Sequence, residues 1–422
     1  VEIEADWHVP PRARKPQRRL RLFGELASGE LSSDMYALYE PPVPAGLSGD
    51  PDRRGWGTVS VVECNDPDVP TEVVVIERQP KDGAVFDQLP FALTPQPPVR
   101  TRPLEESIEA TAAAIADGLP RLPCDAVTDI LLRRPPRTRS GRPVPHDGTI
   151  EDDLTAAGLD LDNSYVAVHG PPGTGKTFTS ARVIERLVNR HRWRVGVVAQ
   201  SHAVVENLFA DLLRAGVDGA RVAKKPNTVS DGWTELDPKA FATFLDEHAA
   251  RGEGCVIGGT GWDFANRCRV PHRALDLLVI EEAGQYSLAN TIAVAPAARN
   301  LMLLGDPQQL PQVSQGTHPE PVDRSALGWL VGEAHTLPPE LGYFLDRSYR
   351  MHPAVCASVS RLSYDGRLQS VAEVTAARRL HGYQPGVRVL TVEHTDNATE
   401  SPEEADAIVA RIGALLGTPW TD

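Results

Sequence analysis

A short run of residues near the middle of the chain has the composition of a loop that binds a polyphosphate. It reads GPPGTGKT and fits the pattern G-x-x-x-x-G-K-[ST], with the fixed positions at Gly170, Gly175, Lys176 and Thr177. Glycines let the backbone fold with several N–H groups turned inward, and the lysine adds a positive charge for the β- and γ-phosphates. The threonine hydroxyl is a ligand for Mg²⁺. The run therefore predicts a site for a nucleoside triphosphate with Mg²⁺.

The segments on either side of this loop have the pattern that such a site requires. Ser164 to His169 is short, apolar and rich in β-branched residues, which is typical of a buried strand. Phe178 to Arg192 places its apolar residues at helical spacing. A helix that begins after the loop turns the positive end of its dipole toward the phosphates. A glycine-rich loop alone would be an ordinary turn, but strand, loop and helix together favour nucleotide binding.

Two carboxylates follow a second apolar strand. The segment from Leu275 to Gln285 reads LDLLVIEEAGQ, so Glu281 and Glu282 stand at the end of that strand. Phosphoryl transfer to water requires one carboxylate that holds Mg²⁺ and a second group that orients or deprotonates the attacking water. The pair is placed for these two roles. The alternative for the pair taken alone is a solvated strand end.

Two further segments carry polar residues that could act on a triphosphate. Leu301 to Val313 reads LMLLGDPQQLPQV, a strand that runs into a polar turn whose glutamine could sense the γ-phosphate. Arg347 to Pro353 reads RSYRMHP. A lone arginine is usually a surface charge, but beside these other segments Arg350 is a candidate to stabilise the transition state.

From Ser164 onward, apolar runs of strand length alternate with helical patterns. Strands are expected at 195–200, 255–260, 275–280 and 301–305, and helices at 203–215 and 287–298. This alternation predicts an α/β domain with a parallel sheet that is covered on both faces. Ligands of such sheets bind at the carboxyl ends of the strands, and each segment described above falls at such an end.

Composition limits the other functions of this chain. Its 422 residues carry a formal charge of −14, which is the wrong sign for a simple nucleic-acid coat. Two dense basic runs, Arg12 to Arg21 and Arg133 to Arg142, could each follow a phosphate backbone or be solvated, proline-containing linkers. The scattered cysteines lack C-x-x-C pairing, so neither a zinc site nor a disulfide framework is expected, and a reducing cytoplasm is the expected location.

The two ends of the chain carry expectations of their own. No signal peptide opens the sequence and no apolar stretch approaches the roughly 20 residues of a membrane span, so no membrane partner is expected. The first residue is Val1 rather than Met, which indicates a fragment or a processed chain.

Composition also divides the chain. Five parts are expected, namely a Pro/Arg-rich lead-in over 1–50, a small β-rich, barrel-like domain over 51–103, a helical stalk and linker over 104–148, a first α/β domain over 149–335 and the start of a second over 336–422. Within the β-rich part, GWGTVSVVE and TEVVVIE are the expected strands. In the last part, a strand at Val387 to Val392 and a helix at Pro402 to Leu416 are expected.

Five segments in order resemble motifs I, Ia, II, III and IV of superfamily 1 helicases. They are GPPGTGKT, AQSHAVVENL (199–208), EEAGQ, GDPQQLPQ and YRMHP. The set is most similar to the branch that contains the nonsense-mediated-decay helicase and bacterial helicases fused to a RecB-like nuclease. The resemblance covers about residues 165 to 355. It implies RecA-like motor domains with ATP and Mg²⁺ between them, and an upstream small barrel joined by helical stalks.

The resemblance also implies roles for individual residues. The phosphate loop, with Gly170, Pro172, Gly173, Thr174, Gly175, Lys176 and Thr177, would bind the triphosphate. Thr177 and Glu281 would bind Mg²⁺, while Glu282 would be the catalytic base and Gln309 the glutamine of motif III. Arg350 would be an arginine finger from the second motor domain, and Tyr349 would stack on adenine. Ser201, His202 and Thr260 would line the single-strand groove.

Three features depart from the family pattern. The metal position usually holds Asp, and Glu281 is one methylene longer, so a bridging water could replace direct ligation of Mg²⁺. Relatives have an adenine-reading Gln upstream of the phosphate loop, whereas 141–164 contains no Gln. The last two helicase motifs, which include a second arginine, are not found before Asp422, so the second motor domain is expected to be truncated.

Together these features predict an ATP-dependent helicase or translocase, an ATP hydrolase that moves along single-stranded nucleic acid. DNA is favoured as the partner because of the resemblance to the bacterial nuclease fusions. RNA remains open, because groove contacts go mainly to the backbone and base faces. A nuclease domain could be fused in the full-length chain, and the resembling branch moves 5′ to 3′. The alternatives are a P-loop switch NTPase and an inactive motor scaffold that is not coupled to translocation.

Overall fold

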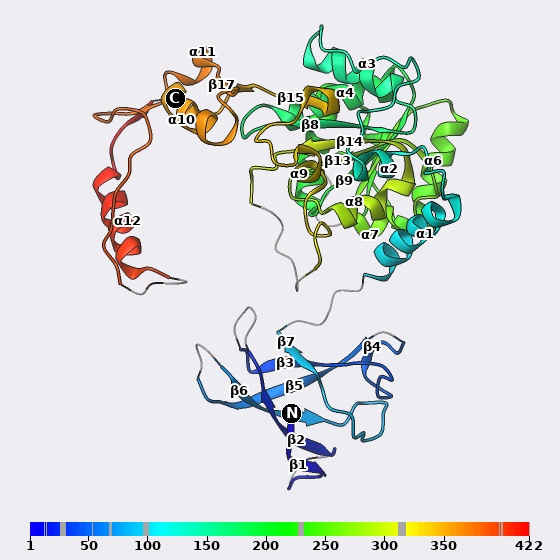
Figure 1. Cartoon of the computed structure of the whole chain (residues 1–422), viewed down its shortest axis with the longest axis vertical. Coiled ribbons are helices and arrows are strands. Elements are labelled where there is room, and N and C mark those ends of the chain that lie inside the picture. The colour runs from blue at the N-terminus through cyan, green and yellow to red at the C-terminus, as the bar shows by residue number, and fades with distance from the viewer. Residues whose placement is uncertain are drawn as a thin grey trace. The chain divides into compact units, whose positions relative to one another are not determined.

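The computed structural model describes the chain apart from residues 12, 14, 26–30, 53, 67–69, 96–100, 227–231, 311–317, 396, 398–399 and 422. The chain forms two compact units, Val1–Arg100 and Thr101–Asp422, which are treated separately below (Figure 1). No helix among the described residues is both long and apolar enough to cross a membrane.

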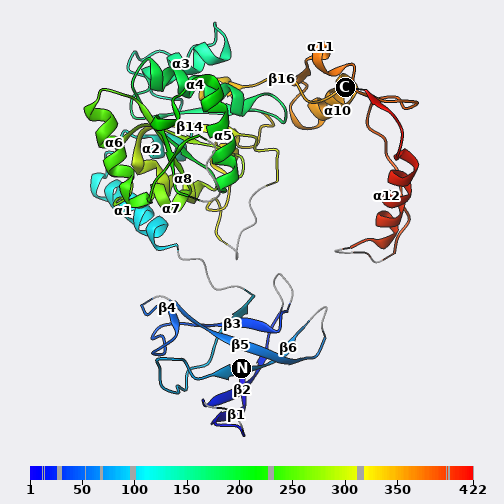
Figure 2. The ribbon, with the colours of Figure 1, turned by 180° about the vertical axis from the view of Figure 1, so that it is seen from behind.

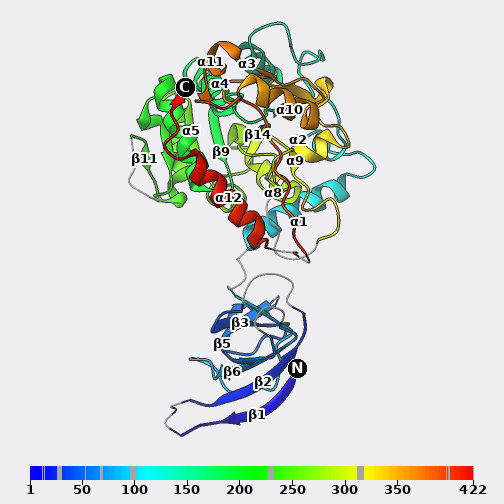
Figure 3. The same ribbon diagram turned by 90° about the vertical axis from the view of Figure 1, so that its left-hand side faces the viewer.

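The first unit is an antiparallel sheet. Its strands are β1 (Glu2–His8), β2 (Gln17–Phe23), β3 (Asp34–Tyr39), β4 (Ser48–Asp50), β5 (Arg54–Cys64), β6 (Glu72–Arg78) and β7 (Ala92–Thr94). They are ordered β1-β2-β6-β5-β3-β7, with β4 paired to β5. The paired strands β1 and β2 are seen side by side in Figure 3. Alternate residues of these strands, among them Leu20, Tyr39 and Val75, form its buried core.

This sheet corrects the expected division at residue 50. β2 pairs with β6 from Gln17 to Phe23, and β3 pairs with β5 from Asp34 to Tyr39. The expected lead-in therefore supplies four of the seven strands, β1 to β4. In β2, apolar residues alternate with arginines at strand period. Because the segment is rich in Pro and Arg, its composition did not indicate these strands.

The arginines of β2 form ion pairs with acidic residues of the same sheet. Arg18 is 1% exposed and forms an ion pair of 2.7 Å with the buried Glu77. Arg19 and Arg21 pair with acidic residues of neighbouring strands, and Glu4 is shared by both. Because acceptors within the sheet already engage these guanidinium groups, neither a solvated linker nor a phosphate-binding run describes residues 17–21. Arg12 and Arg14 lie outside the described residues.

The second unit is built on an eight-stranded parallel sheet with the order β11-β10-β12-β9-β13-β14-β8-β15. Its strands are β8 (Tyr165–His169), β9 (Arg194–Val198), β10 (Val222–Lys224), β11 (Thr234–Glu235), β12 (Cys255–Gly259), β13 (Leu275–Ile280), β14 (Ala298–Gly305) and β15 (Gly342–Phe344). Five of these strands, β8, β9, β12, β13 and β14, fall on the runs expected from the sequence. The α/β fold class and the preceding β-rich unit are confirmed.

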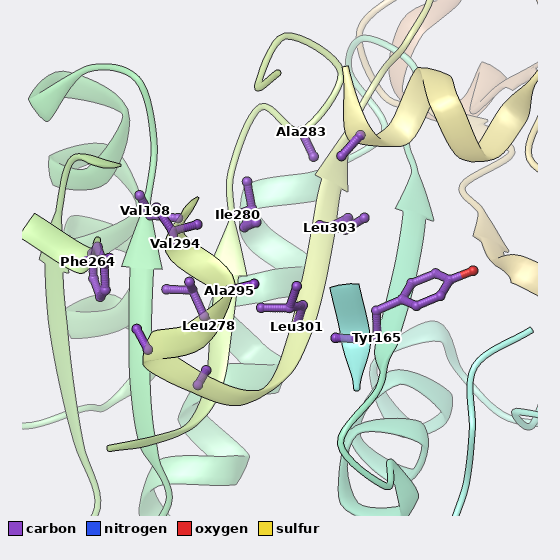
Figure 4. Close-up of a cluster of buried hydrophobic side chains, with 14 of the residues drawn as sticks. Tyr165, Val198, Phe264, Leu278, Ile280, Ala283, Val294, Ala295, Leu301 and Leu303 are labelled. Carbon is purple, nitrogen blue, oxygen red and sulfur yellow. The ribbon is translucent and has the colours of Figure 1, made fainter. Parts of the chain in front are cut away.

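Helices cover both faces of this sheet. On one face lie α3 (Ile150–Asp160), α4 (Lys176–Asn189) and α5 (His202–Ala215), of which α4 and α5 lie side by side (Figure 2). The other face is covered by α2 (Ala126–Leu131), α6 (Phe241–Ala250), α7 (Gly261–Phe264), α8 (Leu288–Val294) and α9 (Ala326–Val331). Figure 4 shows strand residues such as Leu278, Ile280 and Leu303 pointing toward Val294 and Ala295 on this face.

Successive strand residues supply the two cores. In β13, Leu277 and Val279 enter the core with α3 to α5, whereas Leu278 and Ile280 enter the other core. This alternation requires strands that are apolar at every position, which is why the sequence shows them as continuous apolar runs. The carboxyl ends of all these strands then meet at one edge, where the phosphate loop follows β8.

The segment expected to be a stalk is part of this unit. α1 (Arg102–Gly118) packs along α8, where Ser107 Oγ donates a hydrogen bond of 2.6 Å to the Ala293 carbonyl. α2 contributes Ile130 to the core of the sheet. The basic run that follows is also engaged, since Arg133 lies 4.1 Å over the Trp329 ring and Arg137 pairs with Asp129. Residues 104–137 thus belong to the unit built on the parallel sheet and do not form a separate stalk.

The last part of the chain differs from the expected second domain in two ways. β15 pairs with β8 and extends the main sheet, so the boundary expected after residue 335 is wrong. The strand expected at Val387–Val392 is absent from this described segment, which is exposed and pairs with no other strand. The short pairs β16 (Arg347–Ser348) with β17 (Gln369–Ser370) and β18 (Arg379–Leu380) with β19 (Trp420–Thr421) are present instead.

Three helices complete this part of the chain. They are α10 (Pro353–Ser363), α11 (Ala372–Thr375) and α12 (Pro402–Leu415). α12 matches the expected helix.

Candidate nucleotide-binding site

The phosphate loop lies between β8 and α4 in a conformation that only glycine adopts readily. Gly173 and Gly175 have φ angles of 77° and 80°, and Gly175 caps the amino end of α4. A Cβ atom on Gly170 would lie 2.4 Å from Cγ of Lys176. The fixed glycines therefore permit both the turn and the approach of the lysine, and the loop ends at the positive end of a helix of 14 residues.

The ammonium group of Lys176 is held inside this loop. Its Nζ donates a hydrogen bond of 2.6 Å to the carbonyl of Gly170. Burial lowers the pKa of Lys176, while nearby carboxylates, with Asp306 the strongest, act in the opposite direction. The lysine is thus a charge already placed among the phosphate-binding backbone groups, with acidic side chains around it.

Glu281 is almost completely buried at the end of β13, with an exposed fraction of 3%. Its Oε1 accepts a hydrogen bond of 3.0 Å from Ser180 Oγ, one turn into α4 after Thr177. Burial raises the pKa of Glu281 to about 7; Glu282 adds to this effect and the Ser180 hydrogen bond opposes it. A buried charged carboxylate requires a partner, and a bound cation would supply one. Ser180 is a positioning group that our sequence analysis did not single out.

Glu282 lies in the left-handed region with φ at 56°. A non-glycine residue there costs about 1–3 kcal/mol, and such residues collect at functional sites. The turn is supported by hydrogen bonds from the N–H groups of Gln285 and Tyr286 to the Glu282 carbonyl. This backbone turn sets Glu282, which is half-buried, apart from the fully buried Glu281. The two adjacent carboxylates therefore have different surroundings, as two different roles require.

The segments after β13 and β14 are in direct backbone contact. A Cβ atom on Gly284 would lie 2.1 Å from the carbonyl oxygen of Asp306, and one on Gly305 would lie 2.3 Å from the Gly284 nitrogen. The Ala283 N–H also donates to the Leu304 carbonyl at 2.7 Å. The expected carboxylate pair and the GDPQQLP segment therefore form one structure in which neither backbone can move alone.

A buried network centred on Asp306 joins this structure to two other parts of the chain. The Tyr364 hydroxyl donates to Asp306 Oδ2 at 2.8 Å, and His169 Nε2 lies 3.2 Å from Asp306 Oδ1. The Leu337 N–H donates to His169 Nδ1, so the proton of the ring is on Nε2 and points to Asp306. Asp306 thus links the phosphate-loop strand to the end of α10. We did not predict this network, although the aspartate stands in a quoted segment.

The network has a measurable effect on Asp306. Burial by itself raises the pKa of this carboxyl, but hydrogen bonds from His169, Tyr364 and the Gln308 N–H outweigh it and hold the pKa below its usual value. A lowered pKa in the folded state contributes stability that is complete above the unfolded-state value near 3.9 and is lost as the pH falls through the folded-state pKa.

Replacing Tyr364 with phenylalanine should reduce that contribution. The change removes one donor from a buried carboxylate, which costs about 1–3 kcal/mol in the free energy of unfolding at pH 7. The difference from wild type should shrink as the pH falls below the pKa of Asp306, because the carboxyl is then neutral in both proteins. Urea unfolding at pH 7 and at successively lower pH values, over the whole acid range in which the protein folds, measures both effects. A loss that grows as the pH falls would contradict the assigned role of Asp306.

Residues 348–350 lie directly on the phosphate loop. The Tyr349 N–H donates to the Gly173 carbonyl at 2.8 Å, and Ser348 Oγ donates to the Pro172 carbonyl at 3.2 Å. A Cβ atom on Gly173 would lie 2.2 Å from Cβ of Arg350. The structure therefore brings Tyr349 and Arg350 to the loop, as their expected positions require. The guanidinium group of Arg350 is exposed and hydrogen-bonds no other described residue.

A chain of amide groups runs across the carboxyl edge of the sheet. Gln200 Nε2 donates to the Gln285 carbonyl at 2.7 Å, and Gln285 Nε2 lies 3.5 Å from Gln309 Oε1. Gln309 is thus connected to the segment after β9, on the side away from the phosphate loop. Gln285 and Gln200 were not assigned roles from the sequence, although both stand in quoted segments.

The three residues expected to contact nucleic acid also lie at this edge. β9 and β12 are adjacent and parallel, with Val198 opposite Gly259. Ser201 caps α5, and Thr260 begins α7 and donates to Asp263 at 3.2 Å. The Nδ1 atom of His202 is buried without a hydrogen-bond partner among the described residues, and burial lowers the pKa of His202. The three residues thus follow the ends of two adjacent strands, and one of them has an unused polar atom.

Among the described residues, no cluster of three or more His, Cys, Asp or Glu could hold a metal ion by itself. A Mg²⁺ ion that arrives with a triphosphate needs only one or two protein ligands, because phosphate oxygens and waters complete its octahedron. The Thr177 hydroxyl, at the start of α4, and the buried Glu281 carboxylate are oxygen donors of the required kind. The donor set therefore fits Mg²⁺ bound together with phosphates.

A parallel sheet, a glycine-rich phosphate loop and polar segments at the carboxyl ends of neighbouring strands define a P-loop α/β fold of the RecA-like class. Residues 154–326 match the model of a family described as AAA domain.

Over 248 residues the chain is 25% identical to the DNA replication ATP-dependent helicase/nuclease of Arabidopsis thaliana. The aligned region covers 56% of this chain and 18% of the relative. It is also 25% identical over 251 residues to the regulator of nonsense transcripts 1 homolog of Drosophila melanogaster, covering 50% of this chain and 20% of the relative. The predicted resemblance to superfamily 1 helicases of this group is confirmed.

The chain spans only about a fifth of the length of these curated relatives. Among solved structures it is similar to the arterivirus nonstructural protein 10 helicase in complex with DNA, with a TM-score of 0.32 and 19% identity. That match covers 49% of this chain and 41% of the other.

Proposed function

We propose that this protein hydrolyses ATP at the phosphate loop and uses the reaction to move along single-stranded nucleic acid. One observation carries the proposal. Tyr349 and Arg350 contact the phosphate loop at Gly173, and Ser180, one turn beyond the loop, is bonded to Glu281. The charges of Asp306, Glu282, Glu281 and Arg350 all act on the ammonium group of Lys176. These are the groups that bind, activate and stabilise a transferring phosphoryl group. The relatives named as ATP-dependent helicases support the same activity.

Each group has a distinct part in hydrolysis. Lys176 and the loop N–H groups bind the β- and γ-phosphates, and Thr177 with Glu281 would hold Mg²⁺, which neutralises charge on the phosphate oxygens when bound. Glu282, less buried than its neighbour, orients the attacking water and accepts its proton. Arg350 supplies positive charge to the oxygens on which charge develops in the transition state.

The amide chain gives a route from this site to the proposed nucleic-acid groove. Gln309 is in reach of Gln285, which is bonded to Gln200 immediately before Ser201 and His202. A change at the γ-phosphate position that moves Gln309 therefore moves the backbone that carries the proposed groove. DNA is our favoured substrate, since relatives are named for DNA replication, and RNA is the second candidate because another relative is named for nonsense transcripts.

Single-stranded nucleic acid should increase the rate of ATP hydrolysis. Phosphate release is measured while oligo-dT or oligo-U is titrated, and the ranking of the two polymers reports the substrate. Half-maximal stimulation should require more oligonucleotide as salt increases, because backbone contacts release counterions. Replacing His202 with alanine should raise that concentration about tenfold, the effect of losing one hydrogen bond in a groove.

The exposed His191, replaced with alanine, is the matched control and should leave the titration unchanged. A rate that responds to neither polymer would favour the switch NTPase. An absence of turnover under all conditions would favour the inactive scaffold.

A further inference from the structure

A cavity of about 640 Å³ adjoins the phosphate loop on the side of α3. It is bounded by the first residues of α3, by the loop from Gly173 to Gly175, by the first turn of α4 and by the segment from Phe344 to Tyr349. A cavity of this volume accommodates a nucleobase with its ribose. Since it opens beside the loop that would hold the phosphates, it is the place where the rest of a bound nucleotide would lie.

The cavity has aromatic surfaces for a planar ligand. Phe178 and Tyr349 both line it, and their exposed fractions of 56% and 50% are high for aromatic side chains. Phe178 stands two residues after Lys176 on α4, while Tyr349 is bonded through its N–H to Gly173. Aromatic rings of this kind stack on any base, so they supply affinity without selecting one.

The charged side chains that line the cavity have no partner among the other described residues. Besides main-chain atoms and the threonines of the loop and α4, it is lined by Glu151, Asp346 and Arg347. None of these three side chains forms a hydrogen bond or ion pair with another described residue. A carboxylate only accepts hydrogen bonds and a guanidinium only donates them. The cavity therefore presents two acceptors and one forked donor that the protein itself leaves unused.

This set matches guanine better than adenine. Guanine carries two adjacent donors, N1–H and the N2 amino group, which suit a carboxylate, and two acceptors, O6 and N7, which are the usual partners of arginine. Adenine offers the N6 amino group but places the N1 acceptor beside it, and that atom would face a carboxylate oxygen. With adenine bound, the N1 acceptor and the carboxylate oxygen would therefore face each other without a hydrogen between them.

We propose that this cavity is the base site and that Glu151 and Arg347 make guanine at least as good a ligand as adenine. The inference rests on the proposed function, because it assumes that the phosphate loop binds a triphosphate. It widens the substrate class from ATP to purine nucleoside triphosphates that include GTP.

Calorimetric titration of the protein with non-hydrolysable analogues of GTP and ATP, each with Mg²⁺, tests the proposal. The GTP analogue should bind at least as tightly as the ATP analogue. Replacing Glu151 with glutamine keeps the size of the side chain and adds a donor, and it should shift the ratio of the two dissociation constants toward ATP by about tenfold. Arg347→Met, which keeps much of the length of the side chain but has no donor for O6, should shift the ratio in the same direction and covers the case in which Glu151→Gln does not fold.

Asp147→Asn is the matched control, because Asp147 is an exposed carboxylate just before α3 that does not line the cavity. It should leave the ratio unchanged. The base assignment is overturned if the ATP analogue binds measurably tighter than the GTP analogue in wild type, or if neither variant changes the ratio. Binding of neither analogue would overturn the proposed function, whereas tight binding of both with an unchanged ratio would overturn the base assignment alone.

Discussion

Replacing Lys176 with alanine should lower the turnover number for ATP by about a hundred- to a thousandfold, the effect of removing one preorganised charge from a transition state. The ammonium group is buried in the phosphate loop and bonded to the Gly170 carbonyl, so it is in position before the nucleotide arrives. Its contact strengthens as charge moves onto the β–γ bridging oxygen. Steady-state phosphate release measures the loss.

The fold should survive this change, because the ammonium group bonds only to carbonyls of its own loop. Circular dichroism and thermal unfolding of the variant check this point. Lys239→Ala is the control, since Lys239 is an exposed lysine outside the site. Turnover within threefold of wild type in the Lys176 variant would contradict the assignment of the phosphate loop.

A larger loss is expected at Arg350. An arginine that reaches the γ-phosphate is worth about 10³–10⁵ in rate, so Arg350→Ala should abolish measurable turnover in most assays. Its Cβ lies against Gly173 and its guanidinium group is not held by another described residue, which leaves it free to meet the phosphates. Affinity for a non-hydrolysable analogue should change much less than the rate, because the charge it stabilises develops in the transition state.

Arg361→Ala is the control for this change, as Arg361 is an exposed residue of α10. Arg350→Lys should recover only part of the rate, because an ammonium group keeps the charge without the planar fork. A variant that loses binding and turnover in equal measure would show that Arg350 acts on the ground state and not as a finger.

Much of the motor could be predicted from the sequence because its signals are local. Each strand of the parallel sheet is a continuous apolar run, and each expected segment follows such a run, so strand ends and motifs were located together. This rule predicts the positions of three site residues after strand ends, namely Lys176, Glu281 and Glu282. Their meeting at one edge follows from parallel strand order rather than from any detail of side-chain packing.

The remaining features depend on contacts between distant residues, which a single sequence does not display. Tyr364 bonds to Asp306 from 58 positions away, and no local pattern marks it. The arginines of β2 were interpreted by their charge, whereas their acid partners stand on other strands. β15 was missed because a strand of three residues has too short a pattern to detect.

The central claim is that Gly170 to Thr177 binds a nucleoside triphosphate together with Mg²⁺. Isothermal titration of the protein with a non-hydrolysable ATP analogue tests it most directly. We predict saturable one-to-one binding that weakens by about tenfold or more when Mg²⁺ is replaced by excess chelator, and by a similar factor in Lys176→Ala. Binding that is unaffected by both changes, or the absence of binding in the folded protein, would contradict the account.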